Sequence, residues 1–365
     1  MATIDPWGNT LITSYDKYIT DFHLEQFDPK AFPEPNRLMR RGVVFCGIGL
    51  KEISSCIMQK KPFYVLSGIM PTNDRIHLGN KAVVENISYF QRHGGHAYIL
   101  VADLEAQAAR GISLIEGRKR ALEFHIPAYI ALGLDHNKTT FYFQSENVKV
   151  MQMAYVFSAK VTQNEFDAIY GSMSPSRIMS SLTQVADILF PQFTKRMPGI
   201  IPVGPDQVPH LLLSRDIVNK MKKEGYASPS ALFHKYMPAL NGDFKMSKSH
   251  PESVIDLPMD EKEFTKRINK AVTGGRDTLE EQKRLGAVIE KDMVYELLRQ
   301  HLIEDDTELQ KIHDVYKSGK MTSDEIKKLA IEKMKGFMDA FNKKMDDARK
   351  GISLLHFVKS YRKSH

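Results

Sequence analysis

Apolar residues in the middle of the chain alternate between short continuous runs and runs at helical spacing. The runs Phe63–Leu66 and Ala97–Val101 are typical of strands buried inside a sheet, and Ser67 and Gly68 are expected to end the first of them. Between the two runs, apolar residues recur at helical spacing from Lys81 to Phe90. A strand, a helix and a second strand in this order predict a parallel pair with a right-handed crossover.

The same alternation continues further along the chain. Helices are expected over residues 115–132, 148–160 and 176–189 and through Leu211 to Met221, and strands at Thr140–Phe143 and Ile200–Val203. This order predicts an α/β domain with a doubly wound, parallel, Rossmann-type sheet over residues 61–258. In such sheets ligands bind outside the carboxyl ends of the strands.

The two flanking regions lack this alternation. Residues 1–60 are mixed in character, with three prolines between Phe27 and Asn36, and predict a short N-terminal extension in which residues 40–45 form a strand or turn. Beyond about residue 258, lysine- and glutamate-rich helical periodicity replaces the strand signals. Thr322 begins the clearest helix with a capping-box pattern. An all-helical C-terminal domain is therefore expected over residues 259–365.

The charge, apolar runs and cysteine content of the chain indicate which partners, compartments and metal sites to expect. The 365 residues include 51 basic and 44 acidic side chains, and the net charge of +7 fits a polyanionic partner. No run approaches the roughly 18 apolar residues that span a bilayer, and the first residues lack the features of a signal peptide. We therefore expect a cytoplasmic protein with no membrane partner. Cys46 and Cys56 are too few for a four-thiolate zinc site, and no protein metal site is expected.

The first candidate motif is Ile76-His77-Leu78-Gly79-Asn80, where a strand has ended and a helix begins. A helix N-terminus offers free backbone N–H groups and a positive dipole end to phosphate. Gly79 allows a ligand to approach closely, and His77 can donate to a phosphate oxygen. Taken alone, a histidine at a helix start is more often a cap or a surface residue.

The second candidate motif is Lys245-Met246-Ser247-Lys248-Ser249, a polar loop after Gly242-Asp243. Two ammonium groups can neutralise the charge that builds on a triphosphate as one bond breaks, while hydroxyls hold the remaining oxygens. A solvated surface turn is the alternative interpretation of such a lysine–serine run.

In this order, the two motifs resemble the signature pair of class I aminoacyl-tRNA synthetases, usually His-Ile-Gly-His and Lys-Met-Ser-Lys-Ser. The second motif matches letter for letter. In the first, Leu78 replaces isoleucine and Asn80 replaces the last histidine, but asparagine can also offer an N–H donor. The resemblance implies ATP-dependent activation of an amino acid, with Mg²⁺ accompanying ATP. The catalytic residues it implies are His77, Asn80, Lys245, Ser247, Lys248 and Ser249.

From residue 5 to about residue 345 the chain resembles tryptophanyl-tRNA synthetases. Ser67–Pro71, Ala186–Leu189 and Val203–His210 resemble the bacterial enzymes, whereas Arg40-Arg41-Gly42 and Gly274–Thr278 resemble the eukaryotic and archaeal branch. The resemblance implies L-tryptophan, ATP and tRNA(Trp) as ligands, anticodon recognition by the helical domain, and a homodimer. It implies ATP contacts from Ser67, Gly68, Met70, His77, Gly79, Asn80, Gly204, Asp206 and Met246. It implies tryptophan contacts from Leu66, Gly68, Glu105, Gln184, Asp187 and Gln207.

The choice of tryptophan rests mainly on Asp187. Indole offers one N–H donor and no acceptor, so a buried carboxylate is its natural partner. Asp187 lies within an apolar stretch, Leu182 to Leu189, which favours burial. Leu66 and Leu100 stand where related enzymes carry tyrosine and glutamine, which also favours recognition of indole through Asp187.

Several alternatives remain open at this point. Gln184, one turn before Asp187, either touches the substrate or orients Asp187. Glu105 either holds the substrate's ammonium group or is a solvated acid at a helix start. The alternative functions are a tyrosyl-tRNA synthetase and, less favoured, a synthetase-like paralogue that does not charge tRNA.

Overall fold

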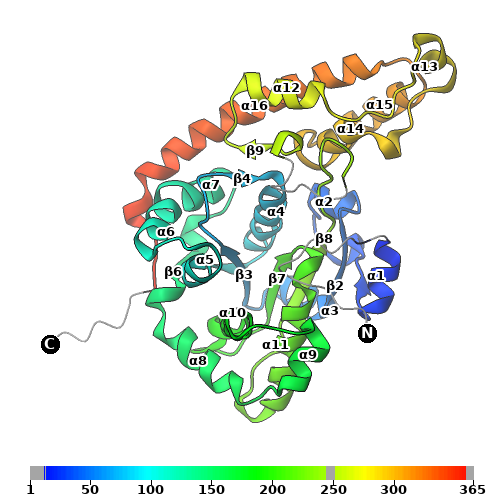
Figure 1. The fold of residues 1–365 in the computed structure, drawn as a ribbon. Coiled ribbons are helices and arrows are strands. Elements are labelled where there is room, and N and C mark those ends of the chain that lie inside the picture. The colour runs from blue at the N-terminus through cyan, green and yellow to red at the C-terminus, as the bar shows by residue number, and fades with distance from the viewer. Residues whose placement is uncertain (1–11, 13, 244–250, 359–365) are drawn as a thin grey trace.

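A seven-stranded sheet forms the centre of the protein (Figure 1). The computed structural model describes residue 12, residues 14–243 and residues 251–358. In spatial order the strands are β1 (Glu25–Gln26), β2 (Val44–Ile48), β8 (Ser230–His234), β7 (Gly199–Val203), β3 (Phe63–Ile69), β5 (Gly95–Val101) and β6 (Thr139–Phe143). The strands from β8 to β6 run parallel, and β1 and β2 add an antiparallel edge. The predicted α/β fold with a largely parallel, doubly wound sheet is confirmed.

The winding of the sheet reverses at β3. From β3 the chain proceeds to β5 and β6 on one side, and it then returns to β7 and β8 on the other side. The carboxyl ends of β3 and β7 therefore flank the switch point, which is where open α/β sheets bind ligands.

Helices cover both faces of this sheet. They are α1 (Tyr15–Asp21), α2 (Arg37–Arg40), α3 (Leu50–Met58), α4 (Leu78–Arg92), α5 (Asp103–Arg110), α6 (Leu114–Arg120), α7 (Ile126–Ala131), α8 (Val148–Ser158), α9 (Gln163–Tyr170), α10 (Pro175–Leu189) and α11 (Val208–Lys220). Alternate strand residues serve opposite faces. In β3, Tyr64 and Leu66 pack with α8, α10 and α11, whereas Phe63 and Val65 pack with α3 and α4.

The C-terminal region is helical, as expected. Its helices are α12 (Glu261–Asn269), α13 (Leu279–Leu285), α14 (Met293–Leu297), α15 (Asp306–Lys317) and α16 (Ser323–Lys350). Thr322 and Glu325 form the predicted capping box of α16. The predicted apolar face of α16, from Ala330 to Met345, is buried and packs partly against α7, so this region shares a core with the sheet domain. No described helix is long and apolar enough to cross a membrane.

The structure corrects three local expectations. β3 does not end at Ser67 but continues through Gly68 to Ile69, because both residues pair in register with β5. α4 begins at Leu78 rather than Lys81, so the first motif forms its first turn. Part of the expected N-terminal extension joins the sheet as β1 and β2, and β8 has no counterpart among the expected strands.

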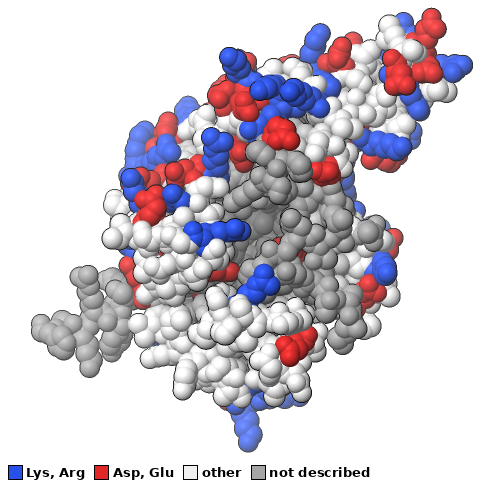
Figure 2. Space-filling model, viewed as in Figure 1, with Lys and Arg blue, Asp and Glu red and all other residues white. Residues whose placement is uncertain are grey.

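Surface charge is unevenly distributed. In Figure 2 charged side chains of both signs crowd the C-terminal helices α12 and α16, whereas the surface over α8 and α10 is mostly uncharged. The two regions therefore present chemically different surfaces to partners.

Candidate active site

A pocket of about 460 Å³ lies at the carboxyl ends of β3 and β7, where the winding reverses. All the predicted ATP- and tryptophan-binding residues that the structure describes line it: Leu66, Ser67, Gly68, Met70, His77, Gly79, Asn80, Glu105, Gln184, Asp187, Gly204, Asp206 and Gln207. The predicted loop residues Lys245, Met246, Ser247, Lys248 and Ser249 lie outside the described residues. The volume is in the usual range for small-molecule sites.

The first motif builds the N-terminus of α4 into one wall of this pocket. His77 caps the helix, with its Nδ1 accepting a hydrogen bond from the backbone N–H of Gly79 at 3.0 Å. The Oδ1 of Asn80 accepts from the backbone N–H of His77 at 3.1 Å. Since Nδ1 of His77 accepts, the proton of the neutral ring belongs on Nε2, which can donate. A Cβ at residue 79 would lie 2.7 Å from the His77 ring, so this cap requires glycine.

Backbone pairing joins the first motif to the segment that follows the second. The short strand β4 (Ile76–His77) pairs antiparallel with β9 (Asp256–Leu257), and His77 faces Asp256 in the register. Asp256 and Leu257 therefore lie at the start of α4. The described segment that follows the second motif in the sequence is thus paired with the first motif.

Asp187 lies in a different wall of the pocket, and each of its two carboxylate oxygens accepts one hydrogen bond from the protein. Its side chain, on α10, is 1% exposed. The hydroxyl of Tyr142 donates to Oδ1 at 2.9 Å, and Nε2 of Gln144 donates to Oδ2 at 2.6 Å. Burial raises the pKa of Asp187 to about 7, the two hydrogen bonds oppose that rise, and Glu105 and Asp103 add to it. The carboxylate is thus held in a fixed orientation near its point of ionisation.

Gln144 has a free acceptor beside Asp187. A carboxylate only accepts hydrogen bonds, so the bond to Asp187 fixes Nε2 of Gln144 toward it. The Oε1 atom of Gln144 is buried without a hydrogen-bond partner in the described structure, and Gln144 lines the pocket. Tyr142 and Gln144 were not among the predicted site residues, although their place at the end of a predicted strand is a ligand-facing one.

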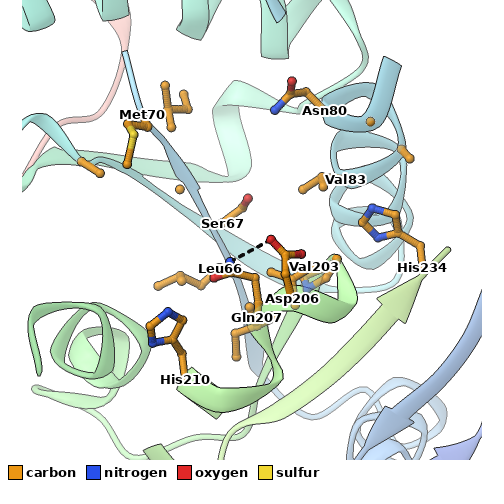
Figure 3. A pocket seen from close by; sticks show the side chains of 18 of the residues that line it. Leu66, Ser67, Met70, Asn80, Val83, Val203, Asp206, Gln207, His210 and His234 are labelled. Carbon is orange, nitrogen blue, oxygen red and sulfur yellow. Dashed lines mark hydrogen bonds between the residues drawn. The ribbon is translucent and has the colours of Figure 1, made fainter. Parts of the chain in front are cut away.

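Gln184 points to the end of β7 rather than to Asp187. Its Nε2 donates to Oε1 of Gln207 at 2.8 Å, and Gln207 donates to Asp206 at 3.4 Å, the bond drawn in Figure 3. Gly204 leaves room for this arrangement, because a Cβ there would lie 2.6 Å from Oδ1 of Asp206. Two roles were left open for Gln184, contact with the substrate and orientation of Asp187; its printed hydrogen bond is to Gln207, and Tyr142 and Gln144 donate to Asp187.

Among the other polar residues that line the pocket and were not predicted are His234 and Gln300. His234 ends β8 and lies beside α4 near Val83 (Figure 3). Gln300 comes from the π-helical turn Leu298–Leu302 in the C-terminal region. Both are buried. Neither could be found from local pattern, because each reaches the pocket only through tertiary packing.

Comparison with known proteins gives concordant results. The family model for class I tRNA synthetases (W and Y) matches residues 58–339. The chain is 37% identical to the tryptophan–tRNA ligase of Methanocaldococcus jannaschii over 96% of both chains, and 37% identical to that of Aeropyrum pernix over 95% of both. The crystal structure of tryptophanyl-tRNA synthetase from Aeropyrum pernix K1 superposes with a TM-score of 0.88 at 36% identity, covering 98% of this chain and all of that one.

Proposed function

This chain belongs to the tryptophan–tRNA ligases of the class I synthetase family, and from that premise we propose how its residues divide the work. It activates L-tryptophan with ATP and transfers it to the 3′ end of tRNA(Trp). In the first step the tryptophan carboxylate attacks the α-phosphate of ATP and pyrophosphate leaves. In the second step the terminal ribose hydroxyl of the tRNA attacks the adenylate carbonyl and AMP leaves. Neither step needs a protein nucleophile, so catalysis consists of positioning and charge stabilisation.

Asp187 accepts the indole N–H of tryptophan, and its burial is the observation that carries this assignment. Each carboxylate oxygen has one fixed donor and can accept a further hydrogen bond from a ligand. A ligand without an N–H at that place would leave the charge unpaired, which is costly. Leu66 and Gly68 flank the indole. Glu105 in the same pocket binds the substrate's ammonium group, and Gln184 and Gln207 form the polar wall beside it.

The nucleotide phosphates lie at the first turn of α4. Apart from the N–H of Gly79, which His77 caps, the backbone N–H groups of that turn, Nε2 of His77 and the amide nitrogen of Asn80 are the donors on this side. By the match of their motif to the family signature, Lys245, Ser247, Lys248 and Ser249 bind the phosphates, and Met246 contributes to ATP binding. Ser67, Met70, Gly79, Gly204 and Asp206 complete the ATP contacts.

Mg²⁺ accompanies ATP in this proposal and neutralises phosphate charge. Among the described residues, no three histidine, cysteine, aspartate or glutamate side chains form a cluster that could hold a metal ion. Phosphate oxygens and water are then its main ligands, which suits the preference of Mg²⁺.

The helical C-terminal region reads the anticodon of tRNA(Trp). Its long helix α16 exposes several lysines, among them Lys335, Lys343, Lys344 and Lys350. Such side chains contact phosphates with little sequence preference and position the RNA. Because tRNA charging serves translation, the protein is placed in the cytoplasm.

The protein assembles as a homodimer through the mostly uncharged surface over α8. Val148, Tyr155 and Val156 are exposed on this helix, Tyr155 at 82%. A monomeric protein seldom exposes so much apolar surface on one helix, and two-fold dimers are the commonest assembly. Light scattering should give twice the chain mass of 41.6 kDa, and Tyr155→Asp should give the monomer. A native monomer at working concentration would contradict this.

The experiment that tests the function is ATP–pyrophosphate exchange with each standard amino acid. Tryptophan should support exchange, and tyrosine should not. Lys248→Ala should lower the exchange rate by about 10²–10³ while tryptophan binding stays nearly unchanged, because the lysine acts on charge that develops in the transition state. Exchange driven better by tyrosine would overturn the choice of substrate.

A further inference from the structure

Gln300 reaches the pocket from the C-terminal helical region. It lies in the turn Leu298–Leu302 directly after α14 and lines the same pocket as His77 and Val83. Its side chain is buried, and its Oε1 has no hydrogen-bond partner in the part of the chain that the structure describes. Buried polar atoms without a partner are rare in folded proteins, so a missing donor is indicated.

The polarity of Gln300 is fixed by its neighbours. Its Nε2 donates to Oε1 of Glu296 at 2.6 Å, and Arg299 donates to both Glu296 oxygens at 2.7 and 2.8 Å. Burial raises the pKa of Glu296, but the Arg299 bonds outweigh it and hold that pKa below its usual value. Because the ionised carboxylate accepts only, the amide nitrogen of Gln300 must face it. The Oε1 atom is then committed to accepting from something else.

His234 provides the second unpartnered atom at this end of the pocket. Its Nδ1 is buried with no hydrogen-bond partner in the described structure. Burial lowers the pKa of His234 to about 4, so the ring is neutral near pH 7. A neutral imidazole offers one donor and one acceptor. Figure 3 shows its ring beside Val83 on α4, away from His210 on α11.

We propose that Gln300 and His234 read the base of the nucleotide, with Oε1 of Gln300 accepting a hydrogen bond from the exocyclic amino group of adenine. The inference rests on the proposed function, which makes ATP a substrate. Tryptophan occupies the Asp187 end, and the phosphates occupy the first turn of α4. One turn further along α4, Val83 offers apolar surface to a flat base, and His234 and Gln300 are the unpartnered polar groups there.

This arrangement selects adenine over a 6-oxo purine. Adenine carries an amino group at its 6 position, whereas hypoxanthine carries an oxygen there. The 6-oxygen of hypoxanthine would lie against Oε1 of Gln300. Both atoms are hydrogen-bond acceptors, so neither would have a donor. The helical C-terminal region thereby takes a direct part in substrate selection.

The test is tryptophan-dependent pyrophosphate exchange with ATP, inosine triphosphate and 2′-deoxy-ATP. The native protein should prefer ATP to inosine triphosphate by about ten-fold or more in kcat/KM. Gln300→Met, which keeps the length of the side chain, should reduce that preference by about three- to ten-fold, the range for one neutral hydrogen bond. Its KM for tryptophan and its ratio of ATP to 2′-deoxy-ATP should not change. Gln310→Met, on the exposed face of α15, is the matched control and should behave as native.

The nucleotide comparison on the native protein does not depend on whether the variant folds. Equal use of ATP and inosine triphosphate by the native protein overturns the proposal. So does a folded Gln300→Met protein that keeps the full preference, or one whose loss falls on the 2′-deoxy comparison, since Gln300 would then contact the ribose. Absence of tryptophan-dependent exchange in the native protein would instead overturn the function on which this inference rests.

Discussion

The two ends of the pocket are built in different ways. At the tryptophan end, Asp187 and its two donors, Tyr142 and Gln144, all belong to the sheet domain, and both carboxylate oxygens are paired without a ligand. At the nucleotide end, His234 comes from β8 and Gln300 from the C-terminal region, and each has an unpartnered polar atom. The first end is organised before its ligand arrives. The geometry of the second end depends on how the C-terminal region packs against the sheet domain.

The same pairing of a glutamine side chain with a carboxylate occurs at both ends of the pocket. A glutamine amide donates to a carboxylate, and its oxygen is thereby committed as an acceptor: Gln144 donates to Asp187, and Gln300 donates to Glu296. In the two proposals, the indole N–H and the adenine amino group are both hydrogen-bond donors, and each is placed beside such a glutamine–carboxylate pair. The two pairs differ in the carboxylate: Asp187 is proposed to accept from its ligand directly, whereas Glu296 accepts from Arg299.

The largest effect is expected from removing the carboxylate at the tryptophan end. Asp187→Ala should weaken tryptophan binding by about ten- to a hundred-fold, the range for a charge-assisted hydrogen bond. Binding of ATP should change little. Titration calorimetry with tryptophan and with benzothiophene-alanine, which has sulfur in place of N–H, measures the contact directly.

The native protein should reject benzothiophene-alanine, and Asp187→Ala should discriminate far less between the two ligands. Asp216→Ala, an exposed aspartate on α11, is the matched control. A variant that keeps full discrimination would show that another group reads the indole.

The pH dependence of tryptophan binding should follow Asp187. The folded-state pKa of about 7 lies above the ordinary value of 3.8, so the protonated carboxyl favours the folded, free protein. That contribution to stability is complete below 3.8 and is lost as pH rises through about 7. Indole needs the ionised form, so affinity should fall by about ten-fold from pH 8 to pH 6.

Calorimetry in buffers of different ionisation enthalpy should detect proton release on binding near pH 6. The charged neighbours of Asp187 are Glu105 and Asp103, and both raise its pKa. The positive charge of the ligand's ammonium group lowers that pKa when the ligand binds. Asp187→Asn should remove both the slope and the proton release. An unchanged slope in that variant would assign the titration to another group.

Tyr142→Phe separates orientation of the carboxylate from its charge. The change removes one donor from Oδ1 of Asp187 and keeps the ring, so the pKa of Asp187 should rise further. Tryptophan affinity at pH 7 should fall by about five-fold, and the midpoint of the pH profile should move upward. Tyr89→Phe, whose hydroxyl donates to the Pro33 carbonyl away from the pocket, is the control. A loss of affinity with an unmoved midpoint would mean that Tyr142 acts through packing alone.

The sequence allowed more to be predicted at one end than at the other. Asp187 could be found because an acid inside the apolar run Leu182–Leu189 is a local signal, and the motif at His77 could be found because it begins a helix. Gln144 was missed because its role depends on a contact with Asp187, which lies on α10 and is 43 residues away in the sequence. Gln300 was missed because helical periodicity says nothing about which other domain a side chain enters.

The same limit applies to the fold. The parallel strands were predicted from buried apolar runs, but the two-residue strand β1 and the edge strand β2 are held by pairing with distant segments. Ser67 and Gly68 were expected to end β3, yet pairing with β5 overrides the turn preference of glycine. Contacts between distant parts of the chain decided each of these features.

The smallest effect should come from loosening the contact between the two regions, and it should fall on the nucleotide end alone. Arg41 donates to the backbone carbonyls of Arg299, Ile303 and Glu304 at 2.6 to 2.9 Å. These hydrogen bonds hold the turn that carries Gln300 against the N-terminal part of the chain. Arg41→Ala should raise the KM for ATP by about three-fold, through partial loss of one positioned hydrogen bond, and should leave the KM for tryptophan unchanged. Hydrogen exchange over residues 293–306 should rise in parallel. Arg40→Ala is the matched control, because Arg40 pairs with Asp306 but binds none of these three carbonyls. If Arg41→Ala raised the KM for tryptophan equally, the two ends of the pocket would not be separable, and the contrast between them would fail.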